Sequence, residues 1–298
     1  MILSVTILFS LNAITQSNFC NIQKVDLSYI SEQKELPEMP IILVSDPKRQ
    51  APLITYASRD NLLENFGATE VVLSSSNTYS HGKFISTLEE YITTSVDASS
   101  QFANETFYLF GNNYDGIFNE LSNIYLNPPC YYCDIAGVKT LGIGGHASGV
   151  SFHLHGPGFS EAIIGRKRWF LFPPSMTKYV SSFNPNMTMA QWVDHIYPQL
   201  LIFENQQQDK YLKQQVISDY IFENYSYFSS NNDMEIGFNR VSNDFNQSIM
   251  QALSRHLYEC TIGPGEVLYF PSMWMHATLN LDAYNVFMSL FIDPQLMK

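Results

Sequence analysis

Short apolar runs separated by glycine and proline dominate the second half of the chain. From about residue 140 the strand-like runs are "GVSFHLHG", "SEAII", "KRWFLFPP", "YECTI", "EVLYFP", "HATLNL" and "NVFMSLFI". They are rich in β-branched and aromatic residues and are bounded by turn residues, as strands joined by tight turns are. Regular short strands of this kind predict a β-barrel or a β-sandwich.

The first half of the chain has a mixed pattern. Strand-like runs occupy 40–44, 69–76 and 105–111, and the segments 58–67 and 86–96 are predicted helices, each with a serine that can cap its N-terminus. We therefore expect residues 18–139 to form an α/β segment that flanks a barrel of residues 140–298.

The strand pattern breaks between about residues 188 and 256. "TMAQWVDHIYPQL" is typical of a helix, whereas "ENYSYFSSNNDMEIGFN" is polar and rich in Asn and Ser, as surface loops are. We interpret residues 199–256 as an insertion into an otherwise continuous β domain.

The chain opens with "MILSVTILFSLNAITQS", an apolar run that is too short to span a bilayer. It is typical of a signal peptide at residues 1–17, cleaved between Ala13 and Ser17, although a buried N-terminal strand or helix would look similar. No later run is long enough for a transmembrane helix. The mature chain is therefore expected in the secretory pathway, most simply in the endoplasmic reticulum lumen.

Glycosylation sequons and cysteines agree with an oxidising lumen. The four N-x-Ser/Thr sequons are at Asn104, Asn186, Asn224 and Asn246. The four cysteines form an even set, which an oxidising compartment allows to pair as disulfides. A formal net charge of −12 would repel nucleic-acid phosphates. We therefore expect no nucleic acid as partner, and a protein substrate or partner in the lumen instead.

Two histidines one residue apart lie in "FHLHGPGFSEAIIGRKRWFLFPP". In a strand, positions i and i+2 point to the same face, so His153 and His155 can share one metal ion. His276, in the apolar segment "SMWMHATLNL", could be a third ligand. Hydrogen-bonded core histidines are the alternative. His146 lies in a glycine loop and is expected to be structural or exposed at the rim, and no role is assigned to the histidines at 81, 195 and 256.

The cysteines predict two disulfides. Cys130 and Cys133 form a C-x-x-C in "NPPCYYCD", and no second Cys or His pair accompanies them to complete a zinc site. A redox-active pair is disfavoured by the two tyrosines between the cysteines and by the absence of a helix N-terminus. A short-loop disulfide is then the simplest expectation. In an oxidising lumen Cys20 would pair with Cys260 and tie the N-terminal segment to the barrel.

Taken together, "SFHLHGPGFSEAIIGRKRWFLFPP" and "GPGEVLYFPSMWMHATLNLD" resemble the JmjC-type, cupin-fold oxygenases that use 2-oxoglutarate and Fe(II). Members place H-x-D/E on one strand, G-x-K-R-W soon after it, and a distal histidine after a V-L-Y-F-P strand. The similarity extends over roughly residues 20 to 295 apart from the insertion. It implies a mostly β fold with flanking helices, built on a double-stranded β-helix, the jelly-roll barrel of cupins.

The resemblance also implies roles for individual residues. His153 would be the first metal ligand and His276 the distal one. Lys167 matches the lysine that pairs with the distal carboxylate of 2-oxoglutarate, although a lysine between two arginines could also be a solvated turn. Ser289 lies where some members place an Asn or Ser near the cosubstrate.

One position departs from the family pattern, because His155 stands where members have Asp or Glu. A third imidazole leaves the metal centre more positive than the usual two-histidine, one-carboxylate site. Three-histidine sites still suit Fe(II) or, instead, Zn(II). Glu161 is a speculative source of the missing carboxylate.

Three functions follow from these residues. The first is a lumenal dioxygenase that hydroxylates a protein side chain. The second is a catalytically silent JmjC-fold interaction or regulatory protein. A zinc hydrolase, the third, lacks an evident general base.

Overall fold

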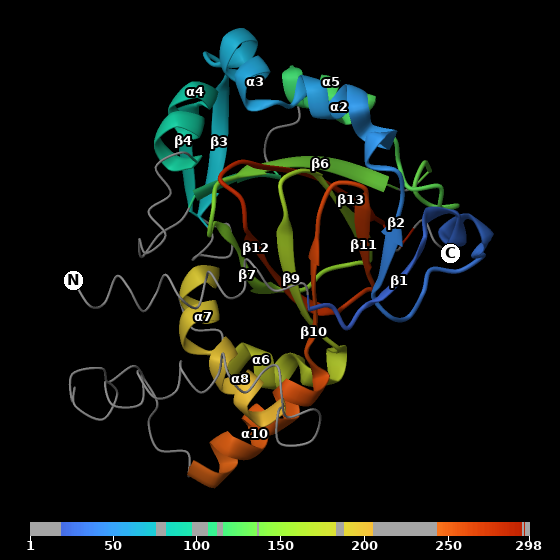
Figure 1. Ribbon diagram of the computed structural model, residues 1–298, viewed down its shortest axis with the longest axis vertical. Helices are drawn as coiled ribbons and strands as arrows, with labels where there is room; N and C mark the ends of the chain where they lie inside the picture. The colour runs from blue at the N-terminus through green and yellow to red at the C-terminus, as the bar shows by residue number, and fades with distance from the viewer. Residues whose placement is uncertain are drawn as a thin grey trace.

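The computed structural model describes residues 19–75, 82–96, 107–111, 116–135, 137–182, 188–204, 243–293 and 295. Eight of its strands form two facing four-stranded antiparallel layers, the double-stranded β-helix predicted from the resemblance (Figure 1). One layer has the order β11-β8-β13-β6 and the other β10-β9-β12-β7. The bounds are β6 Gly137–Gly144, β7 Gly149–His153, β8 Gly158–Ile164, β9 Lys167–Phe172, β10 Tyr258–Ile262, β11 Glu266–Phe270, β12 Met275–Asn280 and β13 Asn285–Ile292.

The barrel forms because both faces of these strands are apolar, yet each face buries against different partners. On β9, Trp169 and Leu171 pack inside the barrel, whereas Phe170 and Phe172 pack outward against helices. The period of two along a strand separates the two sets. Strands covered on both sides read as nearly continuous apolar runs, and "KRWFLF" is one.

Further strands extend the larger layer to nine within the described residues. On one side, β2 (Ile41–Val44) pairs with β11, and β1 (Gln23–Asp26) runs parallel to β2. On the other, β5 (Phe107–Phe110) pairs with β6, followed by β3 (Glu70–Ser75) and β4 (Lys83–Thr87). The N-terminal segment is thus part of the barrel's own sheet.

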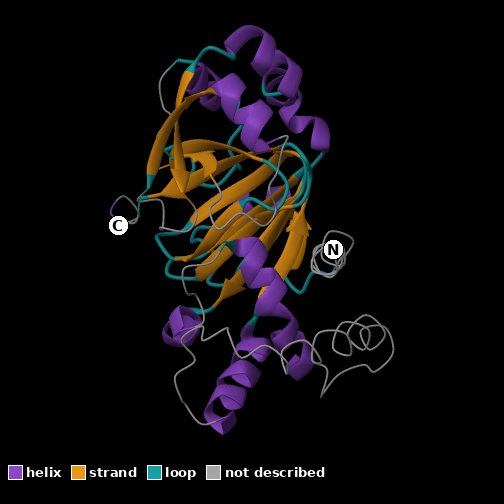
Figure 2. Ribbon diagram, turned by 90° about the vertical axis from the view of Figure 1, so that its left-hand side faces the viewer, coloured by secondary structure: helices purple, strands orange, loops and turns teal. Residues whose placement is uncertain are grey.

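Helices cover the outer face of the nine-stranded sheet. They are α2 (Ala51–Tyr56), α3 (Arg59–Phe66), α4 (Leu88–Glu90) and α5 (Ile117–Ile124), with 3₁₀ turns η1 (Leu27–Glu32) and η2 (Pro47–Gln50) and the π-helical η3 (Tyr91–Val96). Apolar residues of these helices, such as Leu53 and Leu121, pack on Leu141 and Met288 of the sheet. Figure 2 shows helices on this side of the strands.

A second helical layer covers the four-stranded sheet. It consists of η4 (Pro174–Met176), α6 (Thr177–Ser182), α7 (Met189–His195), α8 (Tyr197–Glu204) and α10 (Asn243–His256). Thr188 caps α7 through a capping box with Gln191, which satisfies two backbone N–H groups at the helix start. Trp192 of α7 packs edge-on against Phe152 and Phe170 of the sheet. Most of α8 and all of α10 lie in the predicted insertion, and their side chains complete this core.

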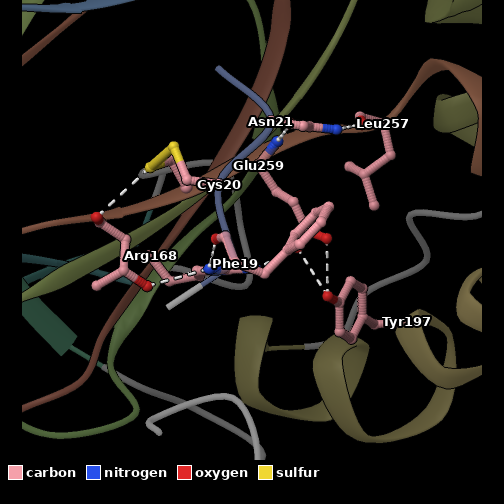
Figure 3. Close-up of polar contacts among 9 residues, drawn as sticks. Phe19, Cys20, Asn21, Arg168, Tyr197, Leu257 and Glu259 are labelled. Carbon is pink, nitrogen blue, oxygen red and sulfur yellow. Dashed lines mark hydrogen bonds and ion pairs between the residues drawn. A yellow bond between two sulfur atoms is a disulfide. The ribbon is translucent and has the colours of Figure 1, made fainter. Parts of the chain in front are cut away.

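The N-terminal residues are fastened to β10 (Figure 3). Cys20 and Cys260 form a disulfide with a Cα–Cα distance of 4.2 Å. Asn21 exchanges hydrogen bonds with Glu259, and its side-chain amide donates to the carbonyl of Leu257 at 2.8 Å. The fully buried Arg168 donates to the carbonyl of Phe19 at 2.7 Å. The segment from residue 19 onward is therefore integral to the barrel wall.

Most predicted elements have counterparts in the structure. The runs at 40–44, 69–76 and 105–111 contain β2, β3 and β5, and the helix expected at 58–67 is α3. The segment 86–96 begins as the end of β4 before it becomes helical. The elements β1, β6, α2 and α5 were not predicted. In the described part of the chain, no helix combines the length and apolarity needed to cross a membrane.

The predicted signal peptide at 1–17 lies outside the described residues, as do the sequons at Asn104, Asn186 and Asn224. Asn246 lies in α10. Glycosylation and the division of the chain at 17 and 139 stay predictions.

Candidate metal centre

Three histidines from two adjacent strands meet inside the barrel. His153 ends β7 and His276 lies opposite it on β12, in the same ladder position. His155 follows two residues after His153, so that its ring turns to the same side. The ring centroids of His153 and His276 are 4.3 Å apart, and those of His155 and His276 are 4.7 Å apart. The structure thus brings together all three histidines predicted from the sequence as metal ligands.

Each histidine is oriented by a backbone carbonyl. The Nδ1 atom of His153 is 2.9 Å from the carbonyl oxygen of Ser151, that of His155 is 2.8 Å from Gly156, and that of His276 is 2.8 Å from Trp274. A carbonyl can only accept, so Nδ1 must carry the proton of each ring. Nε2 of a neutral ring then keeps its lone pair. Carbonyl-oriented histidines with a free Nε2 are characteristic of metal ligands.

The spacing of the ligand atoms is somewhat wider than a bound metal requires. One nitrogen atom from each histidine can be chosen so that all three lie within 4.8 Å of one another. Metal–nitrogen bonds of ~2.1 Å place ligand nitrogens about 3–3.5 Å apart. Binding would therefore draw the ligand nitrogens closer together. The neutral, converging nitrogens fit a divalent cation that accepts imidazole, such as Fe(II) or Zn(II).

Burial keeps these rings neutral. Together with a smaller contribution from the neighbouring His155, burial lowers the pKa of His153 to about 4. Burial also lowers the pKa of His155, and it lowers that of His276 well below the ordinary imidazole value, with the other two histidines contributing. Uncharged imidazoles are the form that binds a metal.

The histidines form one wall of a cavity of about 210 Å³. Lys167 reaches into the same cavity from the start of β9 and is only 4% exposed. The alternative that Lys167 belongs to a solvated turn is therefore wrong. Burial lowers the pKa of its ammonium well below the ordinary value. Hydroxyls of Ser151, Thr278 and Ser289 belong to the lining, and Ser289 also donates to Ser160 at 3.2 Å.

Glu161 does not supply the missing carboxylate. It follows Ser160 on β8, and successive side chains on a strand point to opposite faces, so Glu161 points out of the barrel. There its carboxylate accepts two hydrogen bonds from Arg49 at 3.0 and 3.1 Å and one from Gln50 at 3.0 Å. The cavity lining of the described residues contains no acidic side chain.

The remaining sequence candidates lie elsewhere. Cys130 and Cys133 form a disulfide, and both cysteines are buried in the cluster that includes Phe159 and Leu290 of the nine-stranded sheet. His146 makes its Nδ1 contact with the carbonyl of Leu281 at 2.7 Å, as its structural role predicts. The histidines at 195 and 256 lie in α7 and α10, and His81 is outside the described residues.

Several cavity residues were not recognised from the sequence. Trp169, Phe270 and Phe287 line the site, together with Phe110 from the flanking strand β5. The sequence did carry a signal for Trp169, because it is two residues after Lys167 on β9 and so shares its face. Nothing in the local sequence could show that β5, more than 40 residues before the histidines, would reach the cavity.

A family model for the cupin-like domain matches residues 55–296. The chain belongs to the cupin-like family. This cupin-like chain is similar to JmjC domain-containing protein 8 of Homo sapiens, with 34% identity over 283 residues that cover 94% of this chain and 86% of that protein. It is also similar to the proteins of the same name from Mus musculus and Rattus norvegicus, each 32% identical over 94% of this chain and 85% of theirs. The JmjC resemblance of the two central motifs is thereby confirmed.

Proposed function

We propose that this protein is a metal-dependent oxygenase of the secretory lumen that uses Fe(II) and 2-oxoglutarate to hydroxylate a protein side chain. The observation that carries the proposal is the placement of three oriented histidines and one buried lysine in a single cavity. A metal site alone would not require the lysine, and a buried ammonium in the same lining favours an anionic ligand beside the metal.

His153, His155 and His276 would hold the metal through Nε2, because their Nδ1 atoms are committed to backbone carbonyls. When bound, Fe(II) with 2-oxoglutarate supplies the activation of dioxygen needed to hydroxylate a C–H bond. The apolar and aromatic walls of the cavity exclude water, which strengthens every electrostatic contact inside.

Lys167 would hold the distal carboxylate of the cosubstrate. A buried ammonium is stable only when an anion or another favourable partner faces it. The unpaired indole N–H of Trp169 and hydroxyl of Thr278 line the same cavity, and both are buried without a hydrogen-bond partner. Three buried donors in one cavity fit a ligand with several acceptor oxygens.

The lumenal assignment is supported by covalent structure. Both cysteine pairs form disulfides, and no described cysteine is free. Disulfides persist in oxidising compartments and are rare in the cytosol. A protein substrate in the same compartment is part of the proposal.

The second candidate is a catalytically silent cupin-like protein that binds a partner. Its specific support is His155, which replaces the carboxylate that neutralises the usual metal site. Three neutral ligands leave the full charge of the cation in a cavity that also contains Lys167.

Metal analysis and calorimetry separate the two functions. Purified protein is loaded anaerobically with Fe(II), and metal content and 2-oxoglutarate binding are measured for wild type, His276→Ala and Lys167→Ala. We expect His276→Ala to lose the metal, and Lys167→Ala to keep the metal but lose 2-oxoglutarate. His146→Ala and Lys48→Ala are the matched controls, because neither residue lines the cavity. Wild-type protein that binds metal but no 2-oxoglutarate would support the silent alternative.

A further inference from the structure

The ammonium of Lys167 has an aromatic ring, and no anion, as its nearest partner. Its Nζ atom lies 3.1 Å from the ring centroid of Phe287 and 5.8 Å from that of Trp169. Within the described residues it forms no ion pair, and the cavity lining has no carboxylate. Lys167 begins β9 in the four-stranded layer, whereas Phe287 lies on β13 in the other layer. The contact therefore spans the inside of the barrel.

The Phe287 ring is tightly seated on its other side. Gly142 of β6 is its cross-strand neighbour, and a Cβ atom at position 142 would lie 2.1 Å from Cζ of Phe287. The ring of Phe110 is 5.6 Å away. Only glycine at 142 leaves room for the ring to approach the ammonium. The geometry thus places Phe287 between the wall of the barrel and the charged end of Lys167.

Two further donors belong to residues that line the cavity and have no hydrogen-bond partner. The indole N–H of Trp169 and the hydroxyl of Thr278 are buried and unpaired, and these two residues are cross-strand neighbours on β9 and β12. A buried donor without a partner is destabilising, so such groups are rare unless a ligand or water pairs with them. The cavity therefore has the donors of an anion site, but its cation is covered by a ring.

We propose that Phe287 is a specificity-determining residue of this anion site, and that its ring must leave Lys167 before a dicarboxylate can pair with the ammonium. The inference rests on the proposed function, since it concerns the distal carboxylate of the same cosubstrate. The cation–π contact takes the place of the ion pair in the free protein. A short oxo-acid that reaches only the metal site does not compete with the ring. Phe287 therefore disfavours 2-oxoglutarate relative to pyruvate, which has no distal carboxylate.

Calorimetry on protein loaded with Mn(II), in place of Fe(II), tests this selectivity. We expect Phe287→Leu to tighten 2-oxoglutarate binding by about tenfold, the order of a desolvated cation–π contact. Pyruvate binding should change less than about twofold, because the leucine removes nothing that pyruvate displaces. Phe291→Leu is the matched control, since Phe291 lines the cavity from the same strand but contacts His155 and Phe270. Unchanged or weaker 2-oxoglutarate binding in Phe287→Leu would overturn the selectivity.

A second measurement tests, without any cosubstrate, whether the Phe287 ring acts as a gate that covers the ammonium of Lys167. Cyanate is small and carbamylates amines, so peptide mass spectrometry can follow Lys167 against the exposed Lys48 as internal reference. We expect Phe287→Leu to accelerate carbamylation of Lys167 by more than about tenfold, as removal of a desolvated cation–π contact allows. Gly142→Ala should do the same in a chain that keeps Phe287, because the added methyl leaves no space for the ring.

The two measurements distinguish a failure of the Phe287 proposal from a failure of the proposed cosubstrate. If Lys167 reacts faster in both variants but no variant binds 2-oxoglutarate, the gate stands and the proposed cosubstrate is wrong. If Lys167 reacts at the wild-type rate in Phe287→Leu, or equally fast in Phe291→Leu, Phe287 is not the gate. Thermal unfolding of each variant verifies that the comparison is made on folded protein.

Discussion

Arg168 and Glu259 form an ion pair that is buried on both sides, with 2.6 Å between Nη2 of the arginine and Oε2 of the glutamate. They are close across the β9–β10 ladder on the outer face of the sheet, beneath the helical layer. The hydroxyl of Tyr197 in α8 donates to the same carboxylate at 2.7 Å. Arg168 also donates to the carbonyl of Phe19 (Figure 3). One buried pair therefore joins the barrel, the helical layer and the N-terminal segment.

Breaking the Arg168–Glu259 pair should lower the free energy of unfolding strongly. Arg168→Met leaves the carboxylate of Glu259 buried with only Tyr197 as its side-chain partner, and such single truncations of buried pairs cost about 3–5 kcal/mol of unfolding free energy. Urea unfolding measures the loss. The matched control is Arg166→Met, which breaks the half-exposed pair with Asp282 and should cost less than about 1 kcal/mol. Equal losses in both variants would contradict the structural role of the buried pair.

The Cys20–Cys260 disulfide should contribute more to stability than the Cys130–Cys133 disulfide. It links residues 240 positions apart, whereas the other closes a separation of 3. The chain-entropy model gives about 5 kcal/mol for the long loop and about 2 kcal/mol for the short one, both as upper estimates. Urea unfolding of Cys20→Ser with Cys260→Ser, against Cys130→Ser with Cys133→Ser, measures the difference. A larger loss in the second pair of substitutions would be inconsistent with this account.

The Arg166–Asp282 pair predicts a small acid-side dependence of stability. The hydrogen bond from Arg166 lowers the pKa of Asp282 below its ordinary value. A carboxyl whose folded-state pKa is depressed stabilises the fold above its unfolded pKa, and this contribution is lost as pH falls through the folded-state pKa. Wild type should thus exceed Asp282→Asn in unfolding free energy at pH 7, and the two should converge on acidification below about pH 4. His146 lies near the same carboxyl, so the comparison is repeated in His146→Ala.

Glu161 should matter for stability and not for metal binding. Its carboxylate faces Arg49 and Gln50 on the outside of the barrel. Glu161→Gln weakens a buried charge-assisted contact and should cost about 1–3 kcal/mol in urea unfolding. Metal content, measured by mass spectrometry, should equal that of wild type. A loss of metal from folded Glu161→Gln would place this residue back in the site.

The sequence predicted the metal centre better than the cavity around it. His153 and His155 could be placed together because the period of two is a local property of one strand, and His276 was found through its apolar surroundings. The resemblance added Lys167. By contrast, Phe287 and Gly142 act through a cross-strand contact between β13 and β6, and such a pairing depends on register that no local pattern encodes.

The strands likewise divide into those that the local sequence predicts and those that depend on tertiary pairing. Strand-like runs such as "KRWFLF" are recognisable because both faces are covered. β6 has three glycines and one lysine among its eight residues, "GVKTLGIG", and glycine is depleted in strands, so the run did not stand out as one. Its pairing along the whole of β13 makes it a strand nonetheless, which is a tertiary effect.

The identity of the second metal ligand should control turnover. His155→Asp would replace a neutral imidazole by the carboxylate that the JmjC resemblance implies at this position. The carboxylate would offset one charge of a bound Fe(II). We expect the variant to keep its metal and to convert 2-oxoglutarate to succinate at least about tenfold faster than wild type, equivalent to ~1.4 kcal/mol of barrier. Succinate release under air, with Fe(II) supplied, is the measurement. His155→Ala is the control, because it removes the imidazole without adding charge and should show no gain.

Phe291 packs edge-on against His155 with ring centroids 4.8 Å apart, so a shorter side chain at position 155 also frees space beside the metal. The alanine control shares that added space. Faster turnover in both variants would therefore trace the effect to room in the cavity, and faster turnover in His155→Asp alone would trace it to the carboxylate.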